Sequence, residues 1–144
     1  MRKKAHLDNM QLKTLGIPEH NINSWEIIFH DDFYLEYKAL AEPVQNKLVA
    51  LTMILRERGP LLGQPQVDTL KGSSHPNMKE LRFDAVGGVW RVAFAFDPQQ
   101  KAILLVAGDK GGVDQDRFYR DLVRVADERF HKHLKVLNLK KRKQ

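Results

Sequence analysis

The chain contains no cysteine among its 144 residues. Disulfide bonds, thiolate metal ligands and a cysteine nucleophile are therefore excluded. It also has no apolar run long enough to cross a membrane, and its basic start, MRKKAHLDNM, is followed by no apolar segment of the kind found in secretory signals. Together these absences predict a cytoplasmic protein that is not attached to a membrane.

Acidic residues are fewer than basic ones. The 24 lysines and arginines outnumber the 18 aspartates and glutamates, which gives a formal net charge of +6. A chain of this length with 42% hydrophobic residues is large enough for one domain with its own core. The positive charge favours polyanionic partners, of which nucleic acid and the ribosome are the most plausible.

The first half of the chain has the pattern of one strand followed by two helices. The segment WEIIF at 25–29 is rich in β-branched and aromatic residues and predicts a strand. Asp31 and Asp32 are candidate N-caps for a short helix, and Pro43 suits the first turn of a second, amphipathic helix. Residues 1–24 show no steady period and are assigned as an N-terminal extension.

The second half predicts three strands and a long helix. The strands are expected at 78–84, 89–97 and 101–110, and the short turns between them indicate an antiparallel meander. The third strand is apolar on both faces, which places it centrally in the sheet. A helix begins near Asp114, residues 135–144 form a basic C-terminal tail, and its charge run KKRKQ at 140–144 is expected to be mobile.

These elements define a small α+β domain over residues 25–134, with an antiparallel-rich sheet packed on helices. Alternation along the strands puts a set of large apolar side chains on one face, and the helices are expected to pack there. This set is Leu81, Phe83, Trp90, Val92, Phe94 and Phe96. The opposite face is expected to be an open, concave strip.

The opposite face gathers the candidate catalytic residues. Glu80, Arg82 and Arg91 project from it, Lys110 follows the third strand, and Tyr119 lies early in the final helix. Such a set suits cleavage of an RNA phosphodiester without a metal ion. Glu80, or Tyr119 if the cations lower its pKa, is the candidate base for the 2′-hydroxyl. The arginines would stabilise the phosphorane, and Lys110 or Tyr119 would protonate the leaving oxygen.

Three residues in and after the loop before the first of these strands, Lys71, His75 and Lys79, are candidate RNA-binding residues. Each of these residues could instead have a purely structural role. Glu80 and Arg82 are equally compatible with an ion pair at the surface, which contributes only about 0 to 1 kcal/mol. His75 before Pro76 is a residue that shapes turns. No metal site is predicted, because the only close histidine pair lies two residues apart on a helix and points to different sides.

Four blocks, LKGSSHPNMKELRF, WRVAFAFD, AILLVAGDK and RFY, resemble the RelE/ParE superfamily, and most closely its phage-derived HigB-like branch of type II toxin–antitoxin systems. The resemblance covers about residues 25–134 and implies the RelE-like microbial RNase fold. It also implies a toxin that cleaves mRNA, commonly in the ribosomal A site, without a metal or other cofactor. The implied partner is a cognate antitoxin of the helix-turn-helix DNA-binding class.

The resemblance also implies roles for individual positions. Arg91 matches the strand arginine that stabilises the transition state, and Tyr119 falls where RelE has a tyrosine near the scissile phosphate. Glu80 departs from RelE, whose strands are rich in lysine at this place, so the base is not assigned by the resemblance. The other matching positions are those that hold the RNA backbone, Lys71 and Arg82, and the basic position after the central strand, Lys110.

Two alternatives to a ribonuclease follow from the same resemblance. The ParE branch shares the fold but inhibits DNA gyrase and lacks the nuclease residues. A remnant that binds RNA or an antitoxin without catalysis is the second alternative. The presence of Arg82, Arg91, Lys110 and Tyr119 together favours the nuclease branch.

Overall fold

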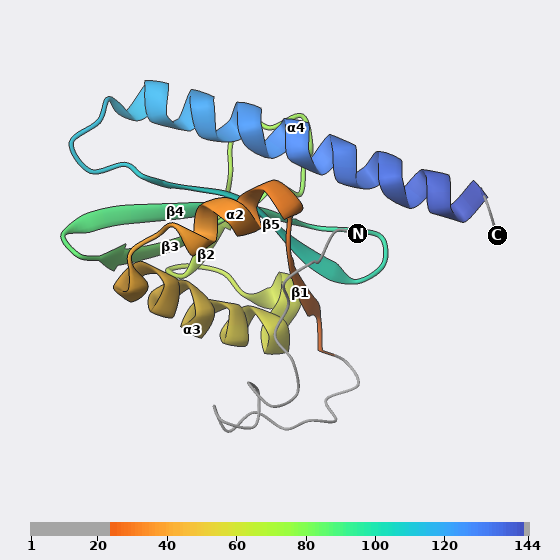
Figure 1. The fold of residues 1–144 in the computed structure, drawn as a ribbon, viewed down its shortest axis with the longest axis horizontal. Coiled ribbons are helices and arrows are strands. Elements are labelled where there is room, and N and C mark those ends of the chain that lie inside the picture. Colours follow the sequence, from red (N-terminus) through yellow and green to blue (C-terminus); the bar gives the residue numbers. More distant parts are fainter. Residues whose placement is uncertain (1–23, 143–144) are drawn as a thin grey trace.

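The fold is a five-stranded sheet with helices on both faces. The computed structural model describes residues 24–142, so the predicted extension at 1–24 lies almost wholly outside the described residues. Helix α4 (Gln115–Arg142) lies along one face of the sheet, whereas helices α2 (Asp31–Lys38) and α3 (Glu42–Arg58) lie on the other (Figure 1). The predicted α+β class is therefore confirmed.

The strands of the sheet have the order β1-β5-β4-β3-β2. Their bounds are β1 Glu26–Phe29, β2 Val67–Thr69, β3 Lys79–Ala85, β4 Gly88–Phe96 and β5 Lys101–Asp109. Strands β3, β4 and β5 form the predicted antiparallel meander, and β1 pairs with β5 in parallel. Strand β5 lies inside the sheet, as its apolar character predicted. Strand β2 was not predicted, because three residues within a loop are too few to show alternation.

Helix α2 begins with a different cap from the one predicted. Asp31 and Asp32 are already its first helical residues, and His30 before them accepts a hydrogen bond at Nδ1 from the backbone N–H of Asp32 (3.2 Å). Helix α3 has Pro43 in its first turn, as predicted, and ends at the 3-10 helix η1 (Gly59–Leu61). Both helices therefore begin close to the positions that the sequence indicated.

Two apolar cores fill the space between the layers. The core under α2 and α3 includes Ile27, Phe29, Phe33, Leu48, Leu55, Leu81, Val92, Phe94 and Leu104. The core under α4 includes Ile28, Ala93, Ala95, Ile103, Leu105, Leu122, Ala126 and Phe130. The prediction that all helices pack on one face was wrong. Ala93 and Ala95 do not leave open space, because α4 packs on these small residues.

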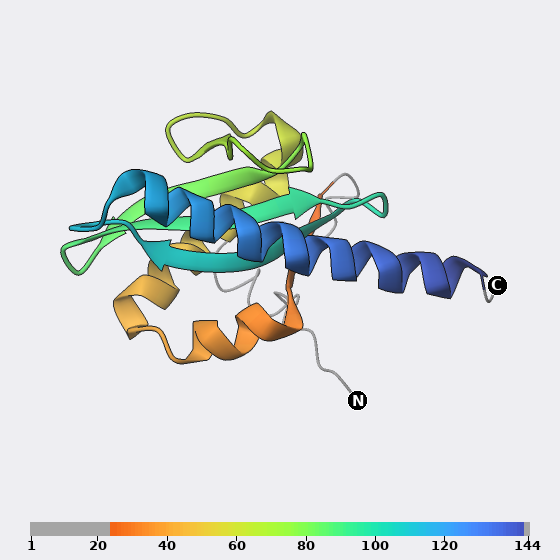
Figure 2. The same cartoon turned by 90° about the horizontal axis from the view of Figure 1, so that it is seen from above.

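Helix α4 is longer than predicted. It runs to Arg142, so the boundary expected at residue 135 falls within a continuous helix that includes residues 140–142. Residues 143–144 lie outside the described residues. The C-terminal turns of α4 extend beyond the sheet, as Figures 1 and 2 show from two sides. The N-terminal turns, in contrast, cover the strand face that carries the candidate catalytic residues.

Candidate functional site

A polar cluster of Glu80, Arg91 and Tyr119, here named the Glu80 cluster, lies between the sheet and the first turns of α4; Glu80 and Arg91 are buried, and Tyr119 is half-buried. The side chains of Glu80 and Arg91 are only 6% and 7% exposed, and Arg91 Nε lies 3.6 Å from Glu80 Oε1. The Tyr119 hydroxyl donates a hydrogen bond to Glu80 Oε1 (3.1 Å) and accepts one from Arg91 Nε (3.3 Å). Three of the five predicted catalytic residues are therefore in mutual contact.

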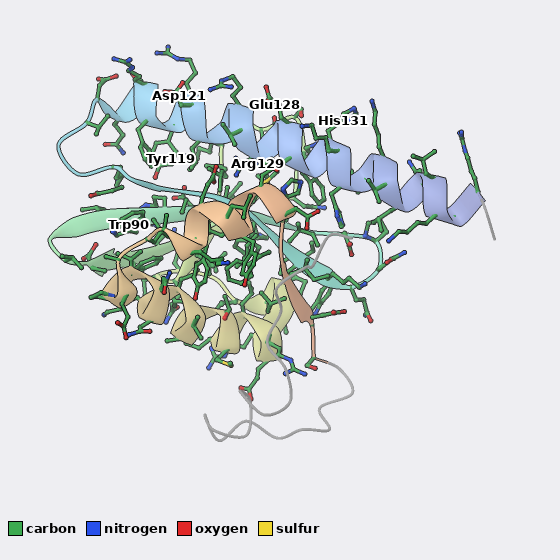
Figure 3. The ribbon with its side chains drawn as sticks, in the orientation of Figure 1. Trp90, Tyr119, Asp121, Glu128, Arg129 and His131 are labelled. Carbon is green, nitrogen blue, oxygen red and sulfur yellow. The ribbon has the colours of Figure 1, made fainter. Side chains whose placement is uncertain are left out.

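Strand register explains why these side chains meet. Glu80 pairs with Ala93, and Arg82 pairs with Arg91, so the charged residues of both strands project from the same face. Tyr119 comes from the other side: Figure 3 shows it below the first turns of α4, between the helix and the sheet. The sequence placed Glu80, Arg82 and Arg91 on one face, but it did not reveal that Glu80 and Arg91 are buried beneath α4.

Burial changes the protonation of the cluster. It raises the pKa of Glu80 above the ordinary value of 4.5, and the Tyr119 hydrogen bond and the charges of Arg91 and Arg82 offset only part of this effect. Glu80 Oε2 is buried and has no hydrogen-bond partner among the described residues. Burial and the Glu80 charge also raise the pKa of Tyr119, against the opposing hydrogen bond from Arg91. Tyr119 was a candidate base only if the cations lowered its pKa; with its pKa raised, this phenol stays protonated at neutral pH.

Arg82 forms the outer rim of the site. Its side chain is 34% exposed, with Nε 3.7 Å from Glu80 Oε1 and Nη1 3.6 Å from Asp68 Oδ2. Hydrogen bonds from the backbone N–H of Thr69 and from the side-chain amide of Gln64 lower the pKa of Asp68. The positive charges of Arg82 and Lys71 lower it further. Lys71 thus lies near the rim. Asp68 was missed by sequence reasoning because it belongs to β2, the strand that was not predicted.

Lys110 borders the other side of the cluster. Its Nζ lies 5.8 Å from the centre of the Tyr119 ring, in a cation–π contact. Its backbone N–H donates to the carbonyl of Val89, which fixes the residue at the end of β5. The five predicted catalytic residues therefore form one continuous strip, from Lys110 through the Glu80 cluster to Arg82.

Two of the predicted RNA-binding residues lie elsewhere. The His75 ring packs edge-on against Phe130 of α4, with ring centres 4.9 Å apart, and its role here is to hold the loop before β3 against the helix. Lys79 is in register with Phe94 on the face opposite to Glu80, because neighbouring residues of a strand alternate. Of the three residues proposed to bind RNA, Lys71 is the one whose charge lowers the pKa of Asp68 at the rim.

A second buried polar pair was not predicted. His133 Nε2 and Asp97 Oδ2 are 2.8 Å apart, and their side chains are 5% and 0% exposed. Asp97 Oδ1 also accepts hydrogen bonds from the backbone N–H groups of Gln99 (2.8 Å) and Lys101 (3.0 Å). Burial alone would raise the pKa of Asp97, but these three hydrogen bonds outweigh it and lower the pKa. The pair ties the β4–β5 turn to α4, whereas His131 is exposed on the other side of the helix.

Among residues 24–142, no three His, Cys, Asp or Glu side chains are arranged to hold a metal ion. No helix in the part of the chain that the structure describes is long and apolar enough to span a bilayer. Helix α4 has 28 residues, but charged side chains occur along its whole length.

Most of the described chain matches one protein family in sequence. Residues 36–131 match the family described as "Phage derived protein Gp49-like (DUF891)", and the chain belongs to this family. The match includes every candidate catalytic residue. The predicted resemblance to the phage-derived HigB-like branch is thereby confirmed.

Two proteins of Mycobacterium tuberculosis (strain H37Rv) are similar to the chain. The protein named "Putative toxin HigB2" is 49% identical over 82 residues, which are 56% of this chain and 40% of that protein. The protein named "Putative toxin HigB3" is 46% identical over 76 residues, which are 53% of this chain and 64% of that protein. The chain therefore spans less than two thirds of the length of either relative. No solved structure is significantly similar to it.

Proposed function

We propose that the chain is the toxin of a type II toxin–antitoxin pair and cleaves mRNA by attack of a 2′-hydroxyl, without a metal ion and on the ribosome. The observation that carries this proposal is the state of Glu80. Its carboxylate is buried, has one oxygen without a partner and has a raised pKa, although two arginines lie beside it. A side chain in this state costs stability, which is typical of a catalytic group. The toxin names of the two relatives support the biological role.

Glu80 acts as the general base in this mechanism. Oε2 accepts the proton of the 2′-hydroxyl, the 2′-oxygen forms a bond to phosphorus, and the bond from phosphorus to the 5′-oxygen breaks. Arg91 and Arg82 donate hydrogen bonds to the phosphoryl oxygens, where negative charge develops. Because Glu80 is only 4% exposed, the ribose reaches it after movement of Tyr119 or of the first turn of α4. Hydrogen bonds of this kind often rearrange when the substrate binds.

Lys110 is the better candidate for the general acid. The attacking and leaving oxygens occupy opposite sides of the phosphorus atom, so the general acid should lie on the side away from the base. The Tyr119 hydroxyl instead donates a hydrogen bond to the base, Glu80. Tyr119 therefore orients the carboxylate, and Lys110 at the border of the cluster gives a proton to the 5′-oxygen. The products are a 2′,3′-cyclic phosphate and a 5′-hydroxyl.

The chemistry can be tested on purified components. The protein is incubated with ribosome-free RNA both in magnesium buffer and in excess EDTA, and in parallel with mRNA bound to ribosomes in magnesium buffer. The same RNA with a single deoxyribose at the cleaved position serves as the matched substrate. Cleavage of the ribose substrate alone supports the mechanism. Cleavage of the deoxyribose substrate would exclude attack by the 2′-hydroxyl, and loss of cleavage of ribosome-free RNA in EDTA alone would show that a metal ion takes part.

The cellular role is tested separately. After induction of the toxin, pulse labelling shows whether protein synthesis or DNA synthesis stops first. An early arrest of protein synthesis supports an mRNA nuclease, whereas an early arrest of DNA synthesis would support the ParE-like alternative.

The net charge of +6 predicts that binding to the ribosome or to RNA weakens steeply with salt.

A further inference from the structure

The positive charge of the chain is concentrated in one segment. Residues 1–128 carry 17 lysines and arginines and 18 aspartates and glutamates, which is a net charge of −1. Residues 129–144 carry 7 lysines and arginines and no acidic residue, so this segment alone has a net charge of +7. Because the two parts together give the formal net charge of +6, the attraction for polyanions comes from the second half of α4.

The catalytic strip, in contrast, is close to electrical balance. Arg82 lies near the carboxylates of Glu80 and Asp68, and Arg91 lies near Glu80 as well. The strip therefore positions a phosphate with few charges that are not already offset. Most of the electrostatic affinity for RNA has to come from another surface.

The carboxylates of α4 that precede the basic segment already have partners. Asp127 accepts hydrogen bonds from the Ser73 hydroxyl and from the backbone N–H (2.9 Å) and the hydroxyl (3.0 Å) of Ser74. Glu128 Oε1 lies 3.8 Å from Arg124 Nη1, one turn earlier in the helix. These carboxylates therefore do not offset the cations that follow them.

Helix α2 offsets some of the cations in the second half of α4. Arg129 donates hydrogen bonds to Glu36 through Nη1 (2.8 Å) and Nη2 (2.6 Å). Lys132 and Lys140 line a cavity of about 270 Å³ together with the two aspartates at the start of α2. Among the described residues, no carboxylate pairs with the three remaining cations, which are Lys135, Lys141 and Arg142.

These remaining cations share one exposed side of α4. His131, Lys135, Asn138 and Arg142 follow one another at intervals of four, three and four residues, which places them in a row along the helix. All of them are exposed, and Lys141 lies beside the row, one turn after Asn138. Figure 3 shows His131 on the side of α4 that faces away from the sheet. This set of residues is named the basic row.

The basic row has the chemistry of a contact to the RNA backbone. Lysine, arginine and asparagine side chains are common hydrogen-bond donors to phosphate oxygens. Protein interfaces depend on buried aromatic or aliphatic anchors, and the large apolar side chain beside the row is Leu139 alone, which is 57% exposed. The helix dipole also favours cations in the last turn, but Lys135 lies about two turns before the end and is not explained in this way.

The position of the row indicates which RNA it contacts. The C-terminal turns of α4 project beyond the sheet, so a large partner can reach them (Figures 1 and 2). Tyr119 and Lys141 are 22 residues apart, which is about 33 Å along the helix axis and corresponds to about ten stacked nucleotides. The few nucleotides around a cleaved bond at Tyr119 do not span this distance. On a ribosome, structured RNA lies on several sides of the bound mRNA.

We propose that the basic row of α4 binds the phosphate backbone of ribosomal RNA, while the catalytic strip near the other end of the helix takes the mRNA. The contact supplies affinity and orientation but no sequence recognition, because phosphates are the same at every position. This inference rests on the proposed function, since it takes the ribosome as the place where the chain acts.

Sedimentation with purified ribosomes that carry no mRNA tests the contact over a series of KCl concentrations. The row variant combines Lys135→Gln, Lys141→Gln and Arg142→Gln, because glutamine removes the charge and is still a good helix former. We expect it to bind about tenfold or more weakly than wild type, and the slope of log affinity against log salt to fall by about 2 to 3. A second variant with Lys135→Arg, Lys141→Arg and Arg142→Lys keeps the charges and should bind like wild type.

A matched control removes the same charge elsewhere. It combines Lys38→Gln, Lys47→Gln and Arg58→Gln, which are exposed positions on α2 and α3. Lys38 and Arg58 also lie in the last turns of their helices, so the control removes cations from helix ends as the row variant does. The control should bind ribosomes within about twofold of wild type, with nearly the same salt slope. Equal losses in the row variant and the control would overturn the inference.

Other partners for the row give different results. If the row variant binds ribosomes like wild type but loses affinity for long single-stranded RNA, the row binds the substrate and the inference fails. It also fails if wild type binds phosphatidylglycerol vesicles rather than ribosomes and the row variant does not, because the row is then a membrane contact.

A short substrate separates this inference from the proposed nuclease activity. The row variant should cleave a ribosome-free RNA of about six nucleotides like wild type, because such an RNA at the strip spans only about 20 Å when stacked. If neither wild type nor the variants cleave any RNA, the nuclease proposal fails, and the sedimentation data still decide whether the row binds ribosomal RNA. If all of them cleave the short RNA and the row variant binds ribosomes like wild type, only the docking inference fails.

Discussion

Replacing Glu80 by glutamine separates catalysis from stability. The change keeps the size of the side chain and an oxygen that can accept the Tyr119 hydrogen bond, but it removes the basic carboxylate. A positioned base contributes about 10² to 10⁴ in rate, so cleavage should fall by that factor. Asp84→Asn on the same strand is the matched control, because Asp84 is exposed and makes the same carboxylate-to-amide change. This control should cleave RNA like wild type.

The same variant should be at least as stable as wild type at neutral pH. The folded protein holds the Glu80 proton more tightly than the unfolded chain does, since burial raises the pKa above 4.5 even with Arg91 and Arg82 nearby. Between the ordinary and the raised pKa, the folded state binds more protons, so wild-type stability falls as pH rises through this window and stays lower above it. Each unit of the pKa shift corresponds to about 1.4 kcal/mol. An amide has no charge to bury and avoids this cost.

Thermal unfolding of wild type, Glu80→Gln and Asp84→Asn at a series of pH values measures this difference. We expect the advantage of Glu80→Gln to be largest at neutral pH and to disappear as the pH falls below the ordinary glutamate pKa. Marked destabilisation of Glu80→Gln at neutral pH would show that the Arg91 ion pair, rather than burial, dominates. Undiminished cleavage by this variant would refute the role of Glu80 as the base.

Three further predictions concern the other residues of the site and Asp97. Arg82→Ala and Arg91→Ala should each lower cleavage by about 10² to 10³ per folded molecule. Arg82→Ala should change stability by less than about 1 kcal/mol. Arg91→Ala should cost about 1 to 3 kcal/mol, because the Tyr119 hydroxyl loses the hydrogen bond from Arg91 Nε and Glu80 loses its closest cation and binds a proton instead. Urea unfolding with parallel RNA assays checks both. Lys110→Ala should slow cleavage more than Tyr119→Phe does, and a reversed order in single-turnover kinetics would make Tyr119 the acid. Asp97→Ala should cost about 3 kcal/mol, because buried hydrogen-bond donors lose their acceptor, yet cleavage per folded molecule should persist. Because the Asp97 pKa is lowered in the folded protein, ionised Asp97 stabilises the fold above the ordinary pKa of 3.8, and this stabilisation is lost as the pH falls through the folded pKa. The difference in unfolding free energy between wild type and Asp97→Ala should therefore become smaller in acid.

The candidate site was largely predictable because it depends on strand alternation. A period of two puts Glu80, Arg82 and Arg91 on one face whatever the tertiary packing is, and short turns fix the register between β3 and β4. The burial of that face was not predictable. The apolar stripe of α4 shows that one side of the helix packs against other parts of the protein. The stripe does not show which face of the sheet the helix covers.

Features that depend on distant contacts were also missed. Asp97 and His133 are 36 residues apart and meet only after β5 and α4 have packed. Asp68 reaches Arg82 through β2, a strand that exists because its backbone pairs with β3 rather than because of its own pattern. The cap of α2 differed for a local reason, since an imidazole nitrogen of His30 replaced the carboxylate that the sequence favoured.

The most direct test of the central claim is a map of newly formed 5′-hydroxyl ends in cellular transcripts after induction. The chain is expressed in parallel as wild type and as Glu80→Gln, at matched protein levels. We expect wild type to produce 5′-hydroxyl ends within coding regions that are being translated, and Glu80→Gln to produce almost none. Growth arrest by the wild-type protein without new 5′-hydroxyl ends would contradict the proposal that this chain cleaves mRNA.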